Sequence, residues 1–380
     1  MGLQEVLDSH QVVVCVGCGG VGKTTTAAAL AMHAAVEGKR VLCLTIDPAK
    51  RLANSMGLEE MTTEEQPVHR ELFAAAGIEP RGTLSAMMLD TKRTFDELVT
   101  KYASTPETKQ RILNNRLYQY ISTSLAGTQE YMAMEKLHAV RASSQYDLII
   151  LDTPPTSEAL DFLDAPERLI EAIDSPAMRW FIGAFTGAGK LGWGLLGKGA
   201  SVVLKGLSKF TGAEFLDQVA ELVVDLNDLF GGFTERANEV SKALRGPEVA
   251  FVLVTSPDPL AIREAIFFAD KLSEHGMRQK ATVINRVTEL IPEPPGSDEE
   301  LTTELAKHVP EGTDAAALNT KLWQALDDER TRAVADRVEV ERLRTLTGGK
   351  GLYVEVPAFE TDVHDLGALS RVASHLTAAE

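Results

Sequence analysis

The chain has 380 residues, an apolar fraction of 44%, a charged fraction of 24% and a formal net charge of −17. The length and composition fit a globular protein with a large α/β core, and the negative net charge disfavours non-specific nucleic-acid binding. Its three cysteines, Cys15, Cys18 and Cys43, indicate a reducing compartment and exclude a disulfide scaffold. We expect neither an N-terminal targeting signal nor a run of roughly 20 apolar residues that could span a membrane, and we predict a cytoplasmic protein with no nucleic-acid partner.

The first predicted elements surround a glycine-rich turn. The apolar run at residues 12–16 predicts a buried strand, and the alanine-rich run that starts at Ala27 predicts a helix. Between them lies GCGGVGKT, residues 17–24, which has the form G-x-x-x-x-G-K-[ST]. Backbone N–H groups of such a loop bind phosphate oxygens, Lys23 would reach the β- and γ-phosphates, and the Thr24 hydroxyl would bind Mg²⁺. We therefore predict that the chain binds a nucleoside triphosphate.

Further apolar runs predict the other strands of one sheet. They lie at 40–46, 84–89, 147–152, 248–255, 282–287 and 352–356, and they alternate with helical patterns at 94–102, 111–120, 259–275 and 366–376. Strands that alternate with helices form parallel βαβ units. The sequence therefore predicts an α/β fold of the P-loop NTPase kind, with a mostly parallel, doubly wound sheet.

Two stretches interrupt this alternation. Residues 165–245 are helical by pattern, and within them 175–212 combines large apolar residues and glycines with charges that are all basic. Residues 289–347 begin with an acidic, proline-rich segment, interpreted as an exposed loop, and continue as a charged helix. We expect a helical client-binding subdomain at 165–245, inserted into an ATPase core made of residues 1–164 and 246–380, with a charged insertion at about 289–347.

Several polar residues follow predicted strands at the carboxyl edge of the sheet, where such folds bind ligands. Asp152 ends YDLIILD and is expected to hold Mg²⁺ through water. Asp147 precedes the strand and is the weaker candidate for this role, since it fits a surface or turn acid better. Asp47 is interpreted as the residue that orients or deprotonates the attacking water, and the alternative is a turn residue before a proline. Asn285 could read an adenine edge or could be a plain turn residue.

These motifs, in this order, resemble the ArsA-type ATPases. The matching segments are GCGGVGKTT, DPA, DTPPT, VINR and VPAFETDVHDL. The family includes arsenite-pump ATPases and the guided-entry ATPases that target tail-anchored membrane proteins, and the bacterial homologues of the latter match best. The resemblance implies an ATP-driven dimeric switch with ATP and Mg²⁺ as cofactors. It also implies a phosphate- and Mg²⁺-binding loop made of Gly19, Gly20, Val21, Gly22, Lys23, Thr24 and Thr25. By the same resemblance, Lys23 and Asp47 are catalytic and residues 152–156 form switch II. Asn285, Pro357 and Phe359 are expected to enclose adenine.

One departure from the family pattern concerns catalysis. Family members usually read GKGGVGKT, and their additional lysine reaches the nucleotide of a dimer partner; here that position is Cys18. A neutral thiol cannot neutralise charge that develops on phosphate, and a cation supplied in this way can be worth about 10³–10⁵ in rate. We therefore expect weak ATP hydrolysis by the chain alone. The partner would be a second copy or, in a heterodimer, a paralogous ATPase that retains the lysine.

A second departure concerns metals. The chain has no C-x-x-C pair for zinc, and Cys15 and Cys43 lie in predicted buried strands, where inert packing is favoured over the binding of As(III). We expect no metal site other than that for Mg²⁺. An arsenite- or anion-pump ATPase subunit stays an alternative, and it would be stimulated by arsenite. A low-activity regulatory partner and a surface-positioning ATPase of the cell-division or partition type also stay open.

The stretch 175–212 bears on the client. A groove with an apolar lining can hold an incoming apolar helix, and in the resemblance this stretch falls where the guided-entry ATPases place their client-binding helices. It could instead be a helical pair packed on its own domain, or a membrane-surface segment, which would allow transient membrane association. The client would be a hydrophobic transmembrane segment, and the residues expected to bind it are Trp180, Phe181, Leu191, Trp193, Leu196, Val203 and Leu207.

Overall fold

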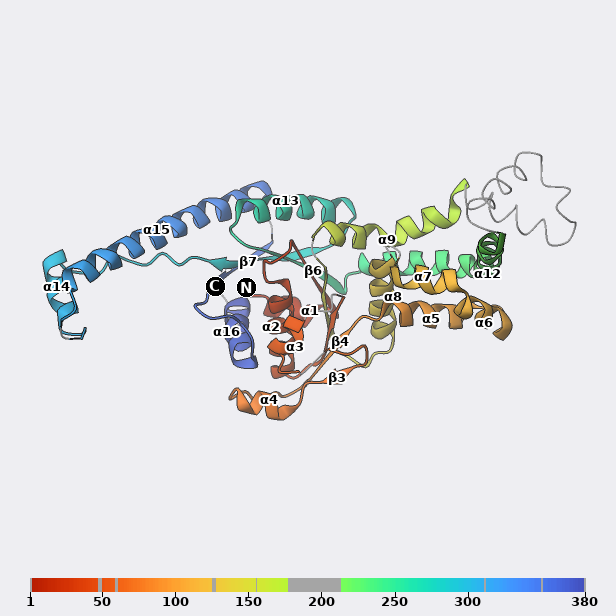
Figure 1. Ribbon diagram of the computed structural model, residues 1–380, viewed down its shortest axis with the longest axis horizontal. Helices are drawn as coiled ribbons and strands as arrows, with labels where there is room; N and C mark the ends of the chain where they lie inside the picture. The colour runs from red at the N-terminus through yellow and green to blue at the C-terminus, as the bar shows by residue number, and fades with distance from the viewer. Residues whose placement is uncertain are drawn as a thin grey trace, which may run out of the picture.

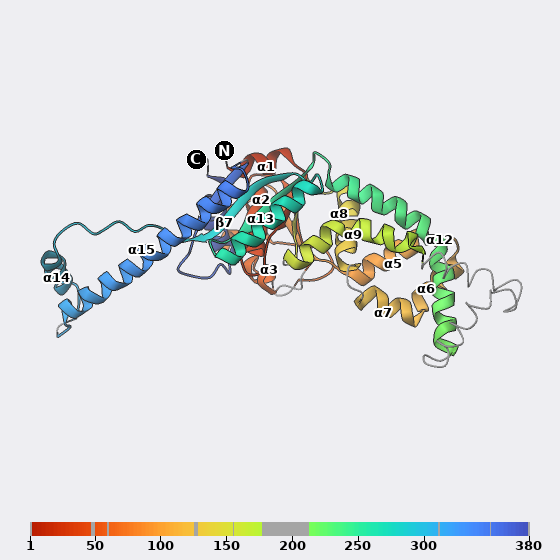
Figure 2. The same ribbon diagram turned by 90° about the horizontal axis from the view of Figure 1, so that it is seen from above.

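The computed structural model describes residues 2–46, 50–58, 61–124, 128–154, 156–176, 213–310, 312–349 and 351–378. A central sheet carries helices on both faces, a group of helices lies at one side of it, and a long helical arm leaves at the other (Figures 1 and 2). The two ends of the described chain lie together (Figure 1), and the Leu3 N–H donates to the Leu376 carbonyl at 3.1 Å.

The sheet has eight strands in the order β3-β4-β2-β5-β1-β6-β7-β8 within the described part of the chain. Its pairings are parallel except that between β3 and β4. The prediction of a mostly parallel, doubly wound α/β fold is therefore confirmed. The strands are β1 (Val12–Val16), β2 (Arg40–Thr45), β3 (Gln66–Pro67), β4 (Thr83–Met88), β5 (Leu148–Asp152), β6 (Val249–Thr255), β7 (Gln279–Val287) and β8 (Leu352–Pro357).

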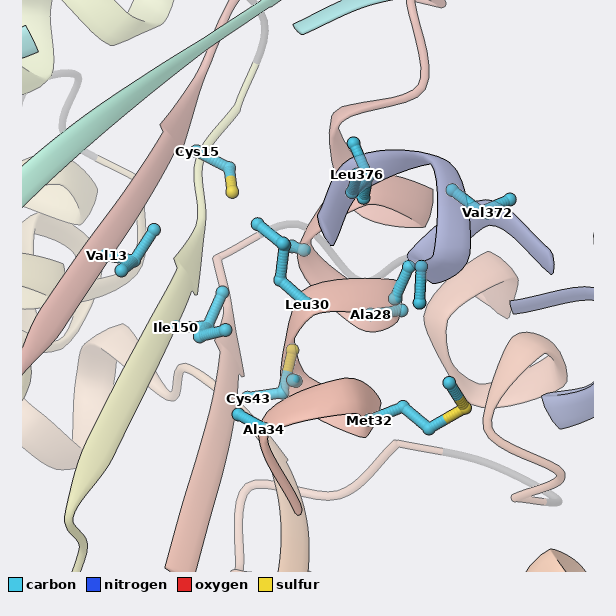
Figure 3. Packing of buried hydrophobic residues seen from close by; sticks show 14 of the residues in the cluster. Val13, Cys15, Ala28, Leu30, Met32, Ala34, Cys43, Ile150, Val372 and Leu376 are labelled. Atoms are coloured by element: carbon cyan, nitrogen blue, oxygen red, sulfur yellow. The ribbon is translucent and has the colours of Figure 1, made fainter. Parts of the chain in front are cut away.

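One face of the sheet packs on the alanine-rich helix α2. Strand side chains alternate between the faces, so Val13, Cys15 and Ile150 point toward Leu30 of α2 (Figure 3). Alanines along α2 let this helix lie close to the sheet, and Cys15 and Cys43 are fully buried in the same cluster. Burial raises the pKa of both thiols, so they remain protonated. The helices on this face are α1 (Gln4–Ser9), α2 (Lys23–Val36), α3 (Lys50–Ser55), α4 (Arg70–Ala75) and α16 (Leu366–Thr377).

The opposite face of the sheet forms a second apolar cluster. Val12, Val14 and Val16, the other half of β1, pack here together with Leu42 and Phe268. Because both faces of the central strands are covered, these strands are apolar at nearly every position except their ends, which explains why they stood out in the sequence. The helices that contribute are α8 (Thr128–Ala142), α13 (Pro259–Glu274), α15 (Ala315–Leu346) and the end of α12 (Ala213–Leu244).

A third apolar cluster holds a helical lobe together beside the sheet. Its members include Tyr118, Leu229 and Phe233, and Phe95 meets the rings of Tyr118 and Phe233 edge to face at 5.9 and 6.4 Å. Helices at 91–142, which the sequence analysis assigned to the ATPase core, contribute to it alongside α9 and α12. The lobe consists of α5 (Thr91–Tyr102), α6 (Pro106–Asn114), α7 (Arg116–Ser124), α8, α9 (Thr156–Asp174) and α12.

The predicted helical pattern at 111–120 was wrong in one respect, because the chain breaks inside it. Helix α6 ends at Asn114 and α7 begins at Arg116. The Asn115 side chain explains the break, since its Oδ1 accepts from the backbone N–H groups of Leu117 and Tyr118 at 2.9 and 3.2 Å. An asparagine that caps a helix in this way competes with a continuous helix.

The charged insertion forms an arm. Residues 288–297 have no regular structure and are mostly exposed, as expected for the acidic loop, and α14 (Asp298–Ala306) and α15 follow. The base of α15 is fixed to the sheet, because Asp336 accepts from the Thr288 N–H at 2.8 Å and Glu355 of β8 accepts from Arg337 and Arg344 at 2.6 and 3.0 Å. Among the described residues, no helix has the length and apolar content needed to cross a membrane.

Candidate functional site

The phosphate loop connects β1 to α2 and depends on two glycines. A Cβ on Gly17 would lie 2.0 Å from the Val254 carbonyl oxygen, and a Cβ on Gly22 would lie 2.2 Å from Asn285 Nδ2. Gly22 also has φ of +97°, a conformation that side chains with a Cβ rarely adopt. The loop therefore sits tightly against the ends of β6 and β7, with the N-terminus of α2 at its base. This cradle fits a phosphate chain.

Lys23, the first residue of α2, is held inside the loop. Its side chain is 7% exposed, and Nζ donates to the carbonyl oxygen of Cys18 at 2.8 Å. The ammonium group is therefore placed among loop backbone atoms and is largely screened from solvent. In this setting a charge acts on a bound anion more strongly than it would in water.

Thr24 and Asp152 meet at the centre of the carboxyl edge. Asp152 is 2% exposed, and its Oδ2 accepts from Thr24 Oγ1 at 2.7 Å and from Thr45 Oγ1 at 3.2 Å. Thr153 Oγ1 donates to the Cys15 carbonyl at 2.8 Å, which fixes the end of β5 against β1. A hydroxyl and a carboxylate are hard oxygen donors of the kind that Mg²⁺ prefers, so this pair fits the metal.

Thr45 was not identified from the sequence. It is the last residue of β2, and the parallel register places it directly beside Asp152 of β5. The available signal was its position, because it ends a strand that neighbours the strand of the predicted magnesium ligand. Using that signal requires the strand order β2-β5-β1, which the sequence pattern alone does not provide.

Asp147 lies at the opposite end of β5 from Asp152. It pairs with Arg40, whose backbone N–H and Nη2 donate to it at 2.9 and 2.6 Å, and both side chains are largely exposed. These hydrogen bonds from Arg40 lower the pKa of Asp147. The residue thus acts as a surface partner of Arg40, in line with its interpretation as a surface acid.

A cavity of about 360 Å³ opens beside the loop. Three residues expected around adenine, Asn285, Pro357 and Phe359, line it, and Gly22 and Thr25 connect it to the phosphate loop. Asn285 also donates from Nδ2 to the Val21 carbonyl at 2.8 Å, a contact that the sequence did not indicate. Ala358, within the segment 357–359 that was expected around adenine, also lines the cavity. Residues not named from the sequence complete the wall: Asn54, Ser55, Arg286, Thr361, Asp362, Val363, His364 and Val372.

Cys18 occupies the position of the family's second lysine and is 9% exposed. Burial raises the pKa of its thiol, and the nearby carboxylates Glu264 and Asp258 on the α13 side raise it further against the opposing effect of Lys23. The residue is therefore a neutral thiol. It brings no positive charge to the loop.

Some predicted site residues cannot be placed. Asp47 lies outside the described residues, as does every residue expected to bind the client: Trp180, Phe181, Leu191, Trp193, Leu196, Val203 and Leu207. In the part of the chain that the structure covers, no group of three or more His, Cys, Asp or Glu side chains could hold a metal ion. The candidate Mg²⁺ site differs from such a group, because Thr24 and Asp152 would share the ion with phosphate oxygens and water.

The mostly parallel sheet and the glycine-rich loop between β1 and α2 are those of the P-loop NTPase fold. The family model of the anion-transporting ATPases, the ArsA type, matches residues 10–182, which include the loop, Asp152 and helices α5 to α9 of the helical lobe. Over these residues the chain is similar to this family of ATPases.

Relatives extend the similarity along most of the chain. It is 26% identical over 304 residues to the ATPase GET3 of Malassezia globosa, covering 78% of each chain. It is 25% identical over 295 residues to the ATPase get3 of Pyrenophora tritici-repentis, covering 75% of this chain and 76% of the relative. The ATPase get3 of Schizosaccharomyces pombe is 27% identical over 280 residues, with 71% of each chain covered.

Replacing Asp152 by asparagine tests the candidate Mg²⁺ site. We expect the Mg²⁺ concentration for half-maximal ATP turnover to rise by about 10–100-fold, the usual cost of losing a partner that acts on a metal through water. Asp147→Asn is the matched control, because it makes the same change at the other end of β5 and should leave the Mg²⁺ dependence unchanged. Equal Mg²⁺ dependence in both variants would remove Asp152 from the metal site.

Proposed function

We propose that the chain is an ATP-hydrolysing dimeric switch that binds the hydrophobic transmembrane segment of a client, as the guided-entry ATPases do. The observation that carries the proposal is the arrangement of the buried Lys23 and Asp152 and the half-buried Thr24 at the glycine-rich loop, in a chain similar to the GET3 ATPases over most of its length. In P-loop ATPases, a loop lysine and a Mg²⁺ ion held by a hydroxyl and a carboxylate neutralise the charge that develops during phosphoryl transfer, which supports the proposal.

The roles of the residues follow from their positions. Backbone N–H groups of the loop would bind the phosphates, and Lys23 would exchange the Cys18 carbonyl for phosphate oxygens. Thr24 and Asp152 would hold Mg²⁺, which when bound neutralises charge on the β- and γ-phosphates. Asp47 is proposed to orient the attacking water. Asn285, Pro357 and Phe359 would surround the adenine in the neighbouring cavity.

The route from the nucleotide to the client begins at Asp152. Directly after it, the chain leads into α9, which packs against α12 and α8 in the helical lobe. A shift of Asp152 on nucleotide binding would therefore reach the lobe through α9. Residues 177–212, which connect α9 to α12 and carry the proposed client-binding side chains, would then respond. This is the sense in which the protein would act as a switch.

The partner in the dimer follows from Cys18. Because the residue is a neutral thiol, a homodimer would lack the cation that the family supplies across the interface. We therefore favour a heterodimer with a lysine-bearing paralogous ATPase, in which this chain has low activity of its own. An anion-pump subunit is the alternative that the family description offers, but Cys15 and Cys43 are fully buried and protonated, which is unsuitable for binding As(III).

Client binding can be tested with a synthetic transmembrane peptide. With ATP and Mg²⁺, the protein, alone and with its paralogue, should keep the peptide from aggregating as measured by light scattering, and Trp193→Asp should abolish most of that protection. Trp323→Asp, the same change on α15, should retain it. Equal protection by the two variants would remove residues 177–212 as the client site, and no protection by the unchanged protein would refute the client proposal.

A further inference from the structure

Asn285 connects the base cavity to the phosphate loop. It lies near the end of β7, and its Nδ2 donates to the carbonyl oxygen of Val21 at 2.8 Å. A backbone carbonyl can only accept, so the amide must present its nitrogen to the loop. The next loop residue, Gly22, is also shaped by this side chain, since a Cβ there would lie 2.2 Å from the same nitrogen.

A bulge in the sheet accompanies this contact. The pairing of β7 with β8 runs regularly to Asn285 opposite Val356 and resumes at Val287 opposite Pro357, which leaves Arg286 as an extra residue. Arg286 has φ of +62°, a left-handed conformation that is unfavourable for a residue with a Cβ. Bulges next to functional sites re-aim side chains. Here the bulge lies directly after the residue that contacts the loop.

We propose that Asn285 is a positioning residue for the phosphate loop: its amide nitrogen fixes the Val21–Gly22 backbone, and through it the placement of Lys23 and Thr24. The proposal rests on nucleotide binding at this loop. It gives Asn285 a task that does not depend on the base. With one N–H of the amide donated to Val21, the second N–H and the amide oxygen remain for a ligand in the cavity.

A ligand without a base separates this role from base reading. Inorganic tripolyphosphate with Mg²⁺ reaches the loop but has nothing to place in the base cavity. If Asn285 holds the loop, Asn285→Asp should weaken tripolyphosphate binding by about tenfold, because a carboxylate oxygen would face the Val21 carbonyl in place of a donor. If Asn285 only reads the base, tripolyphosphate binding should not change. Isothermal titration calorimetry measures the tripolyphosphate affinity of the unchanged protein and of the variant.

The matched control is Asn238→Asp, the same change at an exposed position of α12 that does not line the cavity. It should leave tripolyphosphate affinity at the level of the unchanged protein. Asn285→Ala, which removes the donor without adding charge, should also weaken tripolyphosphate binding. It tests the role of Asn285 if the aspartate variant does not fold. Thermal unfolding without ligand identifies such a case.

A double variant distinguishes positioning from a general loss of stability. Because the Cβ of Gly22→Ala would collide with Asn285 Nδ2, the loss of tripolyphosphate affinity in Gly22→Ala should be smaller in an Asn285→Ala background. Additive losses, or full tripolyphosphate affinity in Asn285→Asp, would overturn the proposal. If the unchanged protein binds neither ATP nor tripolyphosphate, the proposed function fails instead, and the two failures are thereby kept apart.

Discussion

Replacing Lys23 by alanine is expected to lower ATP turnover by at least about 10²–10³-fold, the usual cost of removing one group that stabilises transition-state charge. The ammonium group is 7% exposed and held 2.8 Å from the Cys18 carbonyl, so it is already placed at the phosphate loop before a ligand arrives. Removing it takes away a positive charge from the site where the γ-phosphate would carry its negative charge.

The measurement is steady-state phosphate release by the chain together with its lysine-bearing paralogue, so that a weak activity of the chain alone does not limit it. Lys39→Ala is the control, because that lysine interacts with Leu7 and Asp8 away from the loop. Its turnover should equal that of the unchanged protein. If Lys23→Ala were as active as Lys39→Ala, the assignment of the loop as the catalytic nucleotide site would be wrong.

Replacing Cys18 by lysine is expected to raise the ATP turnover of the chain alone, by up to about 10³-fold if the missing cation is the limiting factor. The thiol is neutral because burial and the carboxylates of Glu264 and Asp258 raise its pKa. Those carboxylates would favour the charged form of a lysine at this position. Cys18→Met is the control, since it adds a side chain of similar length without charge and should leave turnover low.

The outcome also decides how the protein works with a partner. Low turnover of the unchanged chain, a gain in Cys18→Lys and no gain in Cys18→Met would support a heterodimer in which the paralogue contributes the cation. High turnover of the unchanged chain alone would contradict the expected weakness and would require another positive group. Mixing the chain with the paralogue should raise turnover only in the first case.

The sequence predicted the central strands and the glycine-rich turn between β1 and α2 well because both are local features. Strands β1, β5 and β6 are covered on both faces, so each is a continuous apolar run, and the loop has fixed residue spacing between a strand and a helix. Asp152 was identified for a related reason. It ends one of these strands, and strand ends in parallel sheets face the ligand.

Other features depend on contacts that a linear pattern does not show. The two-residue strand β3 is too short for any periodicity, and only its antiparallel pairing with β4 defines it. Thr45 reaches Asp152 because β2 and β5 are neighbours. The contact of Asn285 with Val21 joins residues 264 positions apart, and the bulge at Arg286 that follows it has no signal in VINRV.

The arm has a mechanical consequence. Helix α15 has 32 residues and is therefore about 48 Å long, and its base is tied to the Thr288 end of β7 and to β8, strands that also carry Asn285 and Pro357 at the nucleotide cavity. The part of α15 beyond the tie at Asp336, residues 315–336, is about 33 Å long, so for a rigid lever a turn of about 5° at the tie displaces the tip by about 3 Å. Small movements of β7 or β8 beside the nucleotide cavity would thus produce larger displacements at the tip of α15, where a second protein could bind.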